Sequence, residues 1–245
     1  METPQTRALL NDFAIRSFRD VADNDYIVAR MAHRATLAPQ FLWSSLQAIE
    51  KYLKAILLLN RIPSVRPTHG VSGLISKVTG VEKLRFRPSN ETRKFIDYLD
   101  LYGRFRYLEV SYHASGLHLL ILDRAVWEIR RYCDVLDYYS TKGDGKRIHM
   151  LDRELLRIEE SEEHPENFRW FQGEIEKIIA DPKHPARPDL IRKNFYFAGK
   201  VRTKVQIIDW FRSVNSPLAL NPDLFAEVRK YVFLPKDMVR EFERC

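Results

Sequence analysis

Apolar residues recur along this chain at the spacing of amphipathic α-helices. The clearest repeat lies in residues 41–60, where apolar positions alternate between steps of four and three and a second stripe runs beside the first: Leu42, Leu46, Ile49, Leu53 and Ile56, flanked by Ala48, Tyr52, Ala55 and Leu59. This spacing places both stripes on one wide face of a helix. Because that face is too wide for a surface helix, we expect a central helix packed by two or three neighbours and bounded by Pro39 and Pro63.

The same alternation predicts further helices on both sides of the central one. Residues 15–36 and 114–139 each carry a four-three repeat, and residues 70–79 form a short helix after a proline-marked loop. Ser89 or Asn90 caps another helix, which has aromatic residues on its inner face. Long amphipathic helices of one spacing pack most simply as antiparallel neighbours. We therefore expect an all-α protein built on an antiparallel four- to five-helix bundle.

Asp25 interrupts the apolar stripe of residues 15–36. The stripe runs through Phe18, Ala22, Ala29 and Ala32, so the Asp25 carboxylate falls on the side that should face the core. A buried carboxylate needs a partner or takes up a proton. We expect a structural pairing with an Arg or Lys of the bundle, and we keep an accessory part in catalysis as the alternative.

The helical pattern stops at residues 141–147, where the sequence TKGDGKR contains two glycines and several charges. Such a stretch is typical of a boundary, which divides the chain into a bundle over residues 1–140 and a helical C-terminal extension over residues 141–245. Helices are expected over residues 151–160, 165–180 and 200–214, with two more beginning at Asn221-Pro222 and Leu234-Pro235. This region either braces the bundle or binds a protein partner.

Composition indicates a folded and soluble protein. Hydrophobic residues make up 45% of the chain, and only 9 of its 245 residues are glycine, which favours helices over turn-rich sheet. Its two cysteines form no disulfide framework, and no apolar run approaches the ~20 residues of a membrane span. We expect a cytoplasmic protein without a membrane partner.

The net charge of +7 is concentrated in one part of the chain. Residues 61–94 hold eight Lys and Arg against two Glu, a local charge of +6. A positive patch attracts phosphate backbones. A solvated basic loop explains the same composition, so the charge alone leaves both interpretations open.

The central helix also resembles a known family. Its run QAIEKYLKAILL, residues 47–58, is similar to the second helix of HEPN domains, and the first helix is similar through Ala22, Asp23, Asp25, Tyr26 and Ala29. His69 sits where that family often has a His that opens its next short helix. The resemblance covers roughly residues 15–140. It implies a HEPN-like bundle that works as a homodimer.

The sharpest candidate for chemistry lies between the third and fourth long helices. Arg106 and His113 are separated by six residues, which resembles the R-x(4–6)-H motif of HEPN ribonucleases. A His can take a proton from a ribose 2′-hydroxyl or protonate the leaving 5′-oxygen. A guanidinium can hold the phosphate and stabilise its transition state. The resemblance implies an endoribonuclease that needs no metal or cofactor and leaves 2′,3′-cyclic phosphate ends, with acid and base supplied across the dimer.

One residue departs from the family pattern. Tyr107 follows Arg106, whereas active enzymes of the family usually have Asn, Asp or His there. An Arg-Tyr pair is more similar to the nucleotide-binding or inactive branch. The structural alternatives are a helix-start role for His113, bonded to backbone, and an ion pair of Arg106 with Asp25 or Glu109.

These observations lead to one main functional prediction and two alternatives. We expect an RNA-directed protein of a toxin–antitoxin or defence type, with these site residues: Arg106 and His113 in catalysis, Lys83, Arg85, Arg87 and Arg104 along the RNA backbone, and Asp25 and Glu109 as accessory groups. The first alternative is a non-catalytic module that binds a nucleotide or RNA end, or neutralises a partner such as a nucleotidyltransferase. The second is a helical scaffold. The sequence contains no metal-ligand spacing, phosphate-binding glycine loop or serine-hydrolase motif.

Overall fold

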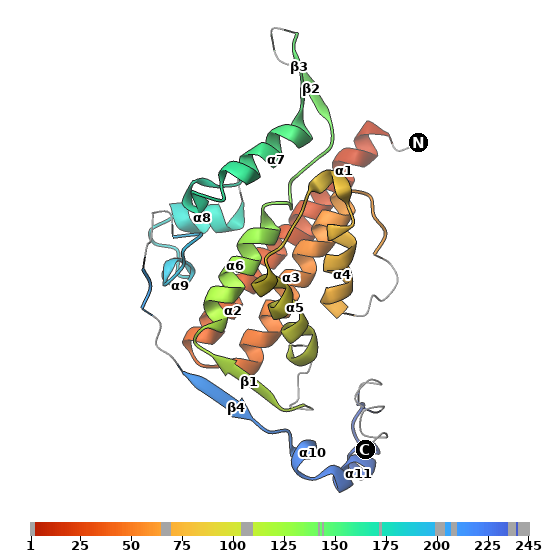
Figure 1. The fold of residues 1–245 in the computed structure, drawn as a ribbon, viewed down its shortest axis with the longest axis vertical. Coiled ribbons are helices and arrows are strands. Elements are labelled where there is room, and N and C mark those ends of the chain that lie inside the picture. The colour runs from red at the N-terminus through yellow and green to blue at the C-terminus, as the bar shows by residue number, and fades with distance from the viewer. Residues whose placement is uncertain are drawn as a thin grey trace.

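A computed structural model describes residues 3–64, 70–103, 110–141, 143, 145–171, 173–198, 204–206, 210–234 and 239. The N-terminal half is a bundle in which the helices lie side by side around a central one (Figure 1). Its helices are α1 (Pro4–Ala14), α2 (Asp20–Arg34), α3 (Ala38–Leu59), α4 (Gly70–Thr79), α5 (Asn90–Tyr102) and α6 (His118–Arg130). Strands in the described part of the chain are short and form two two-stranded sheets. The expected all-α class is confirmed.

α1 and α2 form one long helix that contains a π turn. Residues Ile15–Arg19 make the π-helical hydrogen bonds, which insert an extra residue and rotate α2 relative to α1. The expected helix over residues 15–36 therefore begins earlier, where the Thr3 hydroxyl accepts a hydrogen bond from the Thr6 N–H at 3.1 Å. Beyond its end, Thr36 has a left-handed backbone (φ 57°) that turns the chain towards α3.

α3 is the central helix of the bundle. It packs against α1, α2, α4, α5 and α6, and every residue of the two predicted apolar stripes is buried. Pro39 lies in the first turn of the helix, where its missing N–H leaves no hydrogen bond unmade. The predicted central helix is thus confirmed, and it is covered on more sides than expected.

α5 and α6 differ in how closely they follow the sequence pattern. α5 begins as expected, with the Ser89 hydroxyl accepting from the Thr92 N–H at 3.2 Å. The expected helix over residues 114–139 is wrong at both ends, because strand β1 (Tyr112–Ser115) precedes α6 and the helix ends at Arg130. Beyond Arg130 the chain leaves the helical path in a tight turn, although Cys133 stays buried.

β1 pairs with a strand about a hundred residues later. Strand β4 (Phe211–Val214) runs antiparallel to it, with His113 opposite Ser213 and Ser115 opposite Phe211. The expected helix over residues 200–214 is therefore wrong over these four residues. The local sequence permits a helix, but the backbone N–H and C=O groups of both segments are satisfied across the ladder instead.

The two ends of the expected boundary, Thr141 and Arg147, belong to the paired strands of a β-hairpin. β2 (Tyr139–Thr141) pairs antiparallel with β3 (Arg147–His149). The elements after it are α7 (Met150–Glu160), a 3-10 turn (Pro165–Asn167), α8 (Glu174–Ala180) and α9 (Arg187–Ile191). The expected helix over residues 165–180 is wrong in its first half, because the proline starts only this 3-10 turn.

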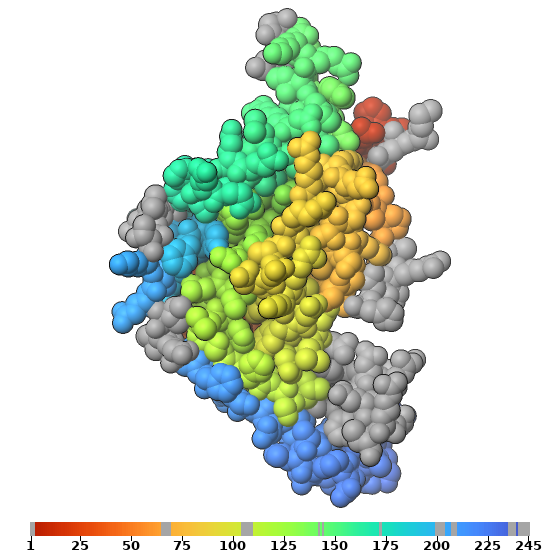
Figure 2. All heavy atoms as spheres, in the orientation of Figure 1, coloured from red at the N-terminus to blue at the C-terminus, as the bar shows by residue number. Residues whose placement is uncertain are grey.

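The region from α7 to α9 shares one hydrophobic core with the bundle. Its contributions include Leu155, Trp170, Ile175, Leu190 and Phe197. Figure 2 shows this region packed directly along one side of the bundle, whereas the later residues lie at one end of the molecule. Those later residues form α10 (Pro217–Leu220), a 3-10 turn (Pro222–Leu224) and α11 (Phe225–Val228) around a small separate cluster. The division of the chain at residue 140 stays a prediction.

The expected helix at Asn221-Pro222 is present as the 3-10 turn that leads into α11. The one expected at Leu234-Pro235 falls mostly outside the described residues. None of the helices in the described part combines the length and apolar character that a membrane span requires.

Candidate active site

His113 lies on β1 inside a cluster of aromatic rings. Its imidazole centroid is 5.2 Å from the ring of Tyr98, 5.5 Å from that of Tyr102 and 6.0 Å from that of His118. The ring of Phe211 on β4 also stacks on the His113 imidazole, with ring centroids 6.0 Å apart and an interplanar angle of 25°. His113 itself is half-buried, and the rings of Tyr98 and Tyr102 pack around its imidazole.

The sequence places these rings together by simple rules. Tyr98 and Tyr102 are four residues apart on α5 and therefore share one helix face. His118 is the first residue of α6, and the chain between it and β1 is only two residues long. The site is thus the junction of the end of α5, β1 and the start of α6.

Hydrogen bonds fix β1 against both helices. The Tyr98 hydroxyl donates to the backbone carbonyl of His113. The Ser115 N–H donates to Nδ1 of His118 at 3.3 Å, and the Ser115 carbonyl lies 3.2 Å from Nε2 of His33. These contacts assign the proton of His33 to Nε2 and leave Nδ1 of His118 as an acceptor.

The neighbouring histidines are held neutral. Burial lowers the pKa of His118 to about 4, and the proximity of His113 and His33 acts in the same direction. Burial also lowers the pKa of His33 to about 4, against the hydrogen bond to Ser115, which favours its charged form. Both side chains therefore carry no charge at pH 7 and do not oppose a positive charge on His113.

Arg104, Arg106 and Glu109 lie outside the described residues. The chain on either side of them is described as far as Gly103 and from Val110. A Cβ at Gly103 would meet the carbonyl oxygens of Leu99 at 2.8 Å and Leu42 at 2.9 Å. The end of α5 is therefore in close contact with α3 just before the segment that carries Arg106.

The basic residues expected to guide RNA lie elsewhere. Lys83 pairs with Asp137 at 3.2 Å, Arg85 with Glu159 at 3.8 Å, and Arg87 donates to the Phe86 carbonyl at 2.9 Å: contacts to two acidic side chains and one backbone oxygen. Lys83 also lines a cavity of about 550 Å³ near Leu59 and Asn60, at the C-terminal end of α3.

His113 is close to the opposite end of α3. His33, which contacts the same strand as His113, packs on Phe41 with ring centroids 5.0 Å apart. The 22 residues of α3 span about 33 Å at 1.5 Å per residue. The structure therefore does not bring Lys83 together with His113.

Asp25 makes the structural pairing that the sequence suggested. Its carboxylate accepts from Nζ of Lys51 on α3 at 2.5 Å, and both side chains are half-buried. The prediction of an ion pair with a bundle cation is confirmed.

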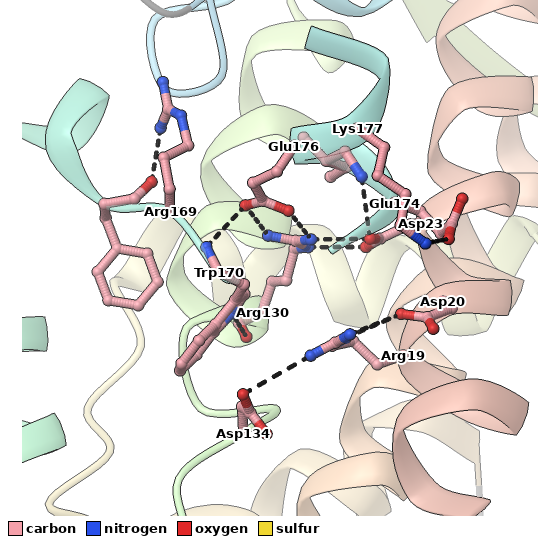
Figure 3. Close-up of polar contacts among 12 residues, drawn as sticks. Arg19, Asp20, Asp23, Arg130, Asp134, Arg169, Trp170, Glu174, Glu176 and Lys177 are labelled. Carbon is pink, nitrogen blue, oxygen red and sulfur yellow. Dashed lines mark hydrogen bonds and ion pairs between the residues drawn. The ribbon is translucent and has the colours of Figure 1, made fainter. Parts of the chain in front are cut away.

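Sequence reasoning missed a buried charge network at the C-terminal end of α6, away from His118 at its start (Figure 3). Asp23 is fully buried and accepts from the Tyr52 hydroxyl at 2.6 Å and from Nε and Nη2 of Arg130 at 2.7 and 2.8 Å. Arg130 also binds both carboxylate oxygens of Glu176 on α8, at 2.9 and 2.8 Å. The Trp170 N–H donates to Glu176 at 3.0 Å. This network ties α8 to α2 and α6.

A second buried network ties α9 and the segment after it to α2 and α6. Arg30 pairs with Asp123 and donates to the backbone carbonyls of Asp189 and Arg192. Tyr26 donates to Asp123 at 2.7 Å and accepts from the Asn194 amide at 2.8 Å. Both networks are enclosed by helices and hold the C-terminal region in place, so we assign them a structural role.

No group of three or more His, Cys, Asp or Glu side chains in the described part of the chain is arranged to hold a metal ion. The site chemistry available at His113 consists of an imidazole, neutral histidines and phenol rings.

Comparison with known families confirms the resemblance of the bundle. Residues 15–131 match the family model of the HEPN domain. Searches among curated proteins and among solved structures gave no significant match. The matched span runs from the π turn to the end of α6 and leaves out the β2–β3 hairpin and everything after it. Residues 15–131 of this protein are therefore a HEPN domain, with His113 just before its last helix.

Proposed function

We propose that this protein is a metal-independent endoribonuclease in which Arg106 and His113 form the catalytic pair. The observation that carries the proposal is the position of His113. It lies at the junction between α5 and the last helix of a HEPN domain, half-buried and fixed by aromatic rings. Arg106 precedes it in the R-x(4–6)-H spacing.

The reaction that fits this pair is an internal transesterification. The 2′-oxygen attacks the adjacent phosphorus as an imidazole takes its proton, the 5′-oxygen leaves with a proton, and a 2′,3′-cyclic phosphate remains. An imidazole has an ordinary pKa close to neutrality and can perform either proton transfer. Arg106 would bind the phosphate oxygens and stabilise their developing charge. In a homodimer, a second copy would supply the other proton-transfer group.

The surroundings of His113 support this assignment. His118 and His33 are neutral at pH 7 because their pKa values are lowered to about 4. Neither of these neighbouring imidazoles therefore adds a positive charge beside His113. We propose that Arg104 contacts the RNA backbone next to the pair. Lys83, Arg85 and Arg87 would contact only more distant parts of a long RNA.

Purified protein incubated with mixed single-stranded RNA in a chelator tests the proposal. We expect cleavage products with 2′,3′-cyclic phosphate ends from the wild type, and none from His113→Ala or Arg106→Ala. His164→Ala is the matched control, because that side chain is 65% exposed and lies on the surface after α7. Equal survival of the RNA with wild type and His113→Ala would refute the nuclease proposal.

Tyr107 supports a second candidate function, a non-catalytic module that binds a nucleotide or an RNA end. Its bulky ring follows Arg106 where active enzymes of the family have a small polar residue or His. This candidate predicts salt-sensitive binding of RNA without turnover. Retention of labelled RNA by a wild type that never cleaves it would favour this candidate over the nuclease.

The C-terminal region supports a third candidate, recruitment of a protein partner. Large apolar side chains are exposed on it well beyond β4: Leu220, Leu224, Tyr231, Val232 and Phe233. Exposed apolar residues that cluster in this way are typical of interaction surfaces. Removal of residues 217–245 should then abolish partner capture and leave RNA cleavage unchanged.

A further inference from the structure

We infer that Phe211 is a stacking platform for an RNA base beside the scissile phosphate, so that strand β4 of the C-terminal region completes the active site of the HEPN domain. The inference rests on the proposed function, and it adds the substrate class: single-stranded RNA. Phe211 lies outside the span that matches the HEPN family model.

The position of Phe211 is unusual for an aromatic residue. One part of its ring stacks on His113, with centroids 6.0 Å apart and planes inclined by 25°. Even so, the side chain is 68% exposed. Burial of a Phe side chain stabilises a folded protein, and Phe211 leaves most of that stabilisation unused because most of its surface is exposed. An exposed ring directly beside a candidate catalytic imidazole is available to a ligand.

The backbone that carries the ring is held in place by the strand ladder and by the residue before it. Phe211 is opposite Ser115 in the β1–β4 ladder. Before it, the Trp210 carbonyl accepts from the Gly116 N–H at 2.9 Å, and the Trp210 ring lies 5.1 Å from His33. A platform that is fixed before the ligand arrives loses little conformational entropy on binding.

The far end of the strand is anchored too. After Val214, the buried residue Ser216 donates its N–H to the hydroxyl of Ser111 at 3.0 Å. Ser213 lies opposite His113 and, by strand alternation, on the same face as Phe211. β4 therefore presents an aromatic ring and a hydroxyl on the side where His113 would act.

The chemistry of an open ring selects the substrate class. Proteins that bind single strands stack successive bases on aromatic side chains, and every base offers a π-face, so the contact tolerates different sequences. Bases in a duplex are already stacked on each other and cannot reach a side-chain ring without unpairing. We therefore assign single-stranded RNA, with little base preference, as the substrate.

Equilibrium binding tests the platform without any turnover. The probe is a short, unstructured, fluorescently labelled 2′-O-methyl RNA, which lacks the attacking hydroxyl, and affinity is measured by anisotropy. Base stacking is worth about 1–3 kcal/mol per base, so Phe211→Ala should weaken binding at least fivefold. Phe211→Trp should keep wild-type affinity, and Phe211→Leu should behave like Ala, because leucine fills space but offers no π-face.

Phe171→Ala is the matched control, because Phe171 is also a highly exposed phenylalanine, at 86%, and it lies in the segment before α8 rather than on β4. It should bind as the wild type does. Thermal unfolding of each variant shows that β4 is intact. Wild-type affinity in both Phe211→Ala and Phe211→Leu overturns the inference, as does equal affinity of the wild type for single-stranded and duplex probes.

The two proposals fail in different experiments. If Phe211→Ala binds RNA more weakly but the wild type does not cleave ordinary RNA, the stacking platform is supported and the nuclease proposal is refuted. If the wild type cleaves RNA and neither Phe211→Ala nor Phe211→Leu changes the KM, the nuclease proposal stands and the stacking platform is refuted. An absence of any RNA binding by the wild type overturns the platform.

Discussion

Replacement of Arg130 by Met should destabilise this protein strongly and in a pH-dependent way. Arg130 is the only cation that contacts both Asp23 and Glu176 within the network drawn in Figure 3, and it makes four hydrogen bonds to them. Asp23 is fully buried and the Glu176 side chain is 11% exposed. Without the guanidinium, two carboxylates remain close together in the protein interior, where water reaches Glu176 only slightly and Asp23 not at all.

The magnitude follows from the structure. Removing one partner of a buried ion pair costs about 3–5 kcal/mol, because the other charge is left uncompensated. The sign of the pH dependence also follows. Burial raises the pKa of the Glu176 carboxyl and Arg130 lowers it, and the net shift in the wild type is downwards. The wild type therefore loses this contribution only as the pH falls below about 4, the ordinary range of a Glu.

In Arg130→Met, burial becomes the largest influence on the Glu176 carboxyl and raises its pKa, against the smaller effect of the backbone hydrogen bonds from Trp170 and from Glu176 itself. A raised pKa in the folded state means that acidification relieves the destabilisation. The difference in free energy of unfolding between the wild type and Arg130→Met should therefore be largest at pH 7 and shrink towards pH 5. The measurement is urea unfolding followed by circular dichroism at both pH values.

Arg131→Met is the matched control. Arg131 is equally buried, but its one acidic partner in the described part of the chain is Glu162, which is 59% exposed. Its other hydrogen bonds go to the backbone carbonyls of Trp127 and Ile158 and to the hydroxyl of Ser161. Its loss leaves no buried carboxylate, so its effect should be the same at pH 7 and pH 5. A loss below about 1 kcal/mol in Arg130→Met, or a loss that does not change with pH, would refute the reasoning.

Three further predictions concern the surroundings of the site. Gly103→Ala should lower stability by about 1–3 kcal/mol, since its Cβ would lie 2.9 Å from the Leu42 carbonyl; an unchanged melting temperature would contradict this. Asp25→Asn should cost no more than about 1 kcal/mol, because the pair with Lys51 is half-buried, and RNA cleavage should persist; loss of cleavage would restore an accessory role. Tyr98→Phe removes the hydrogen bond to β1 and should cost about 0.5–1.5 kcal/mol in chemical unfolding; a neutral or stabilising effect would contradict it.

The sequence alone identified His113 but not its surroundings. The R-x(4–6)-H spacing singled it out, and the residues four apart on α5 could have suggested two of its aromatic neighbours. His33 and Phe211 come from segments far along the chain, and nothing local marks them. Arg106 lies outside the described residues, so its pairing with His113 stays a prediction.

The buried charges show that a charged residue on the polar side of a predicted helix is not always exposed to solvent. Asp25 was singled out because it falls on an apolar stripe, yet Asp23 is the fully buried carboxylate. The buried face of α2 extends further round the helix than the stripe, because the bundle covers one side and α8 and α9 cover the next. A charge opposite the first stripe is therefore enclosed by elements from the second half of the chain.

Sequence by itself determined α3, α4 and the start of α5, because a helix satisfies its backbone through neighbours four residues away. The local sequence was enough to predict the apolar repeat of α3, the serine cap of α5 and the bounds of α4. Tertiary structure alone decided that residues 112–115 and 211–214 are strands, because their hydrogen-bond partners lie about a hundred residues apart. It also decided which charges are buried, since a side chain becomes enclosed only when a distant element packs over it.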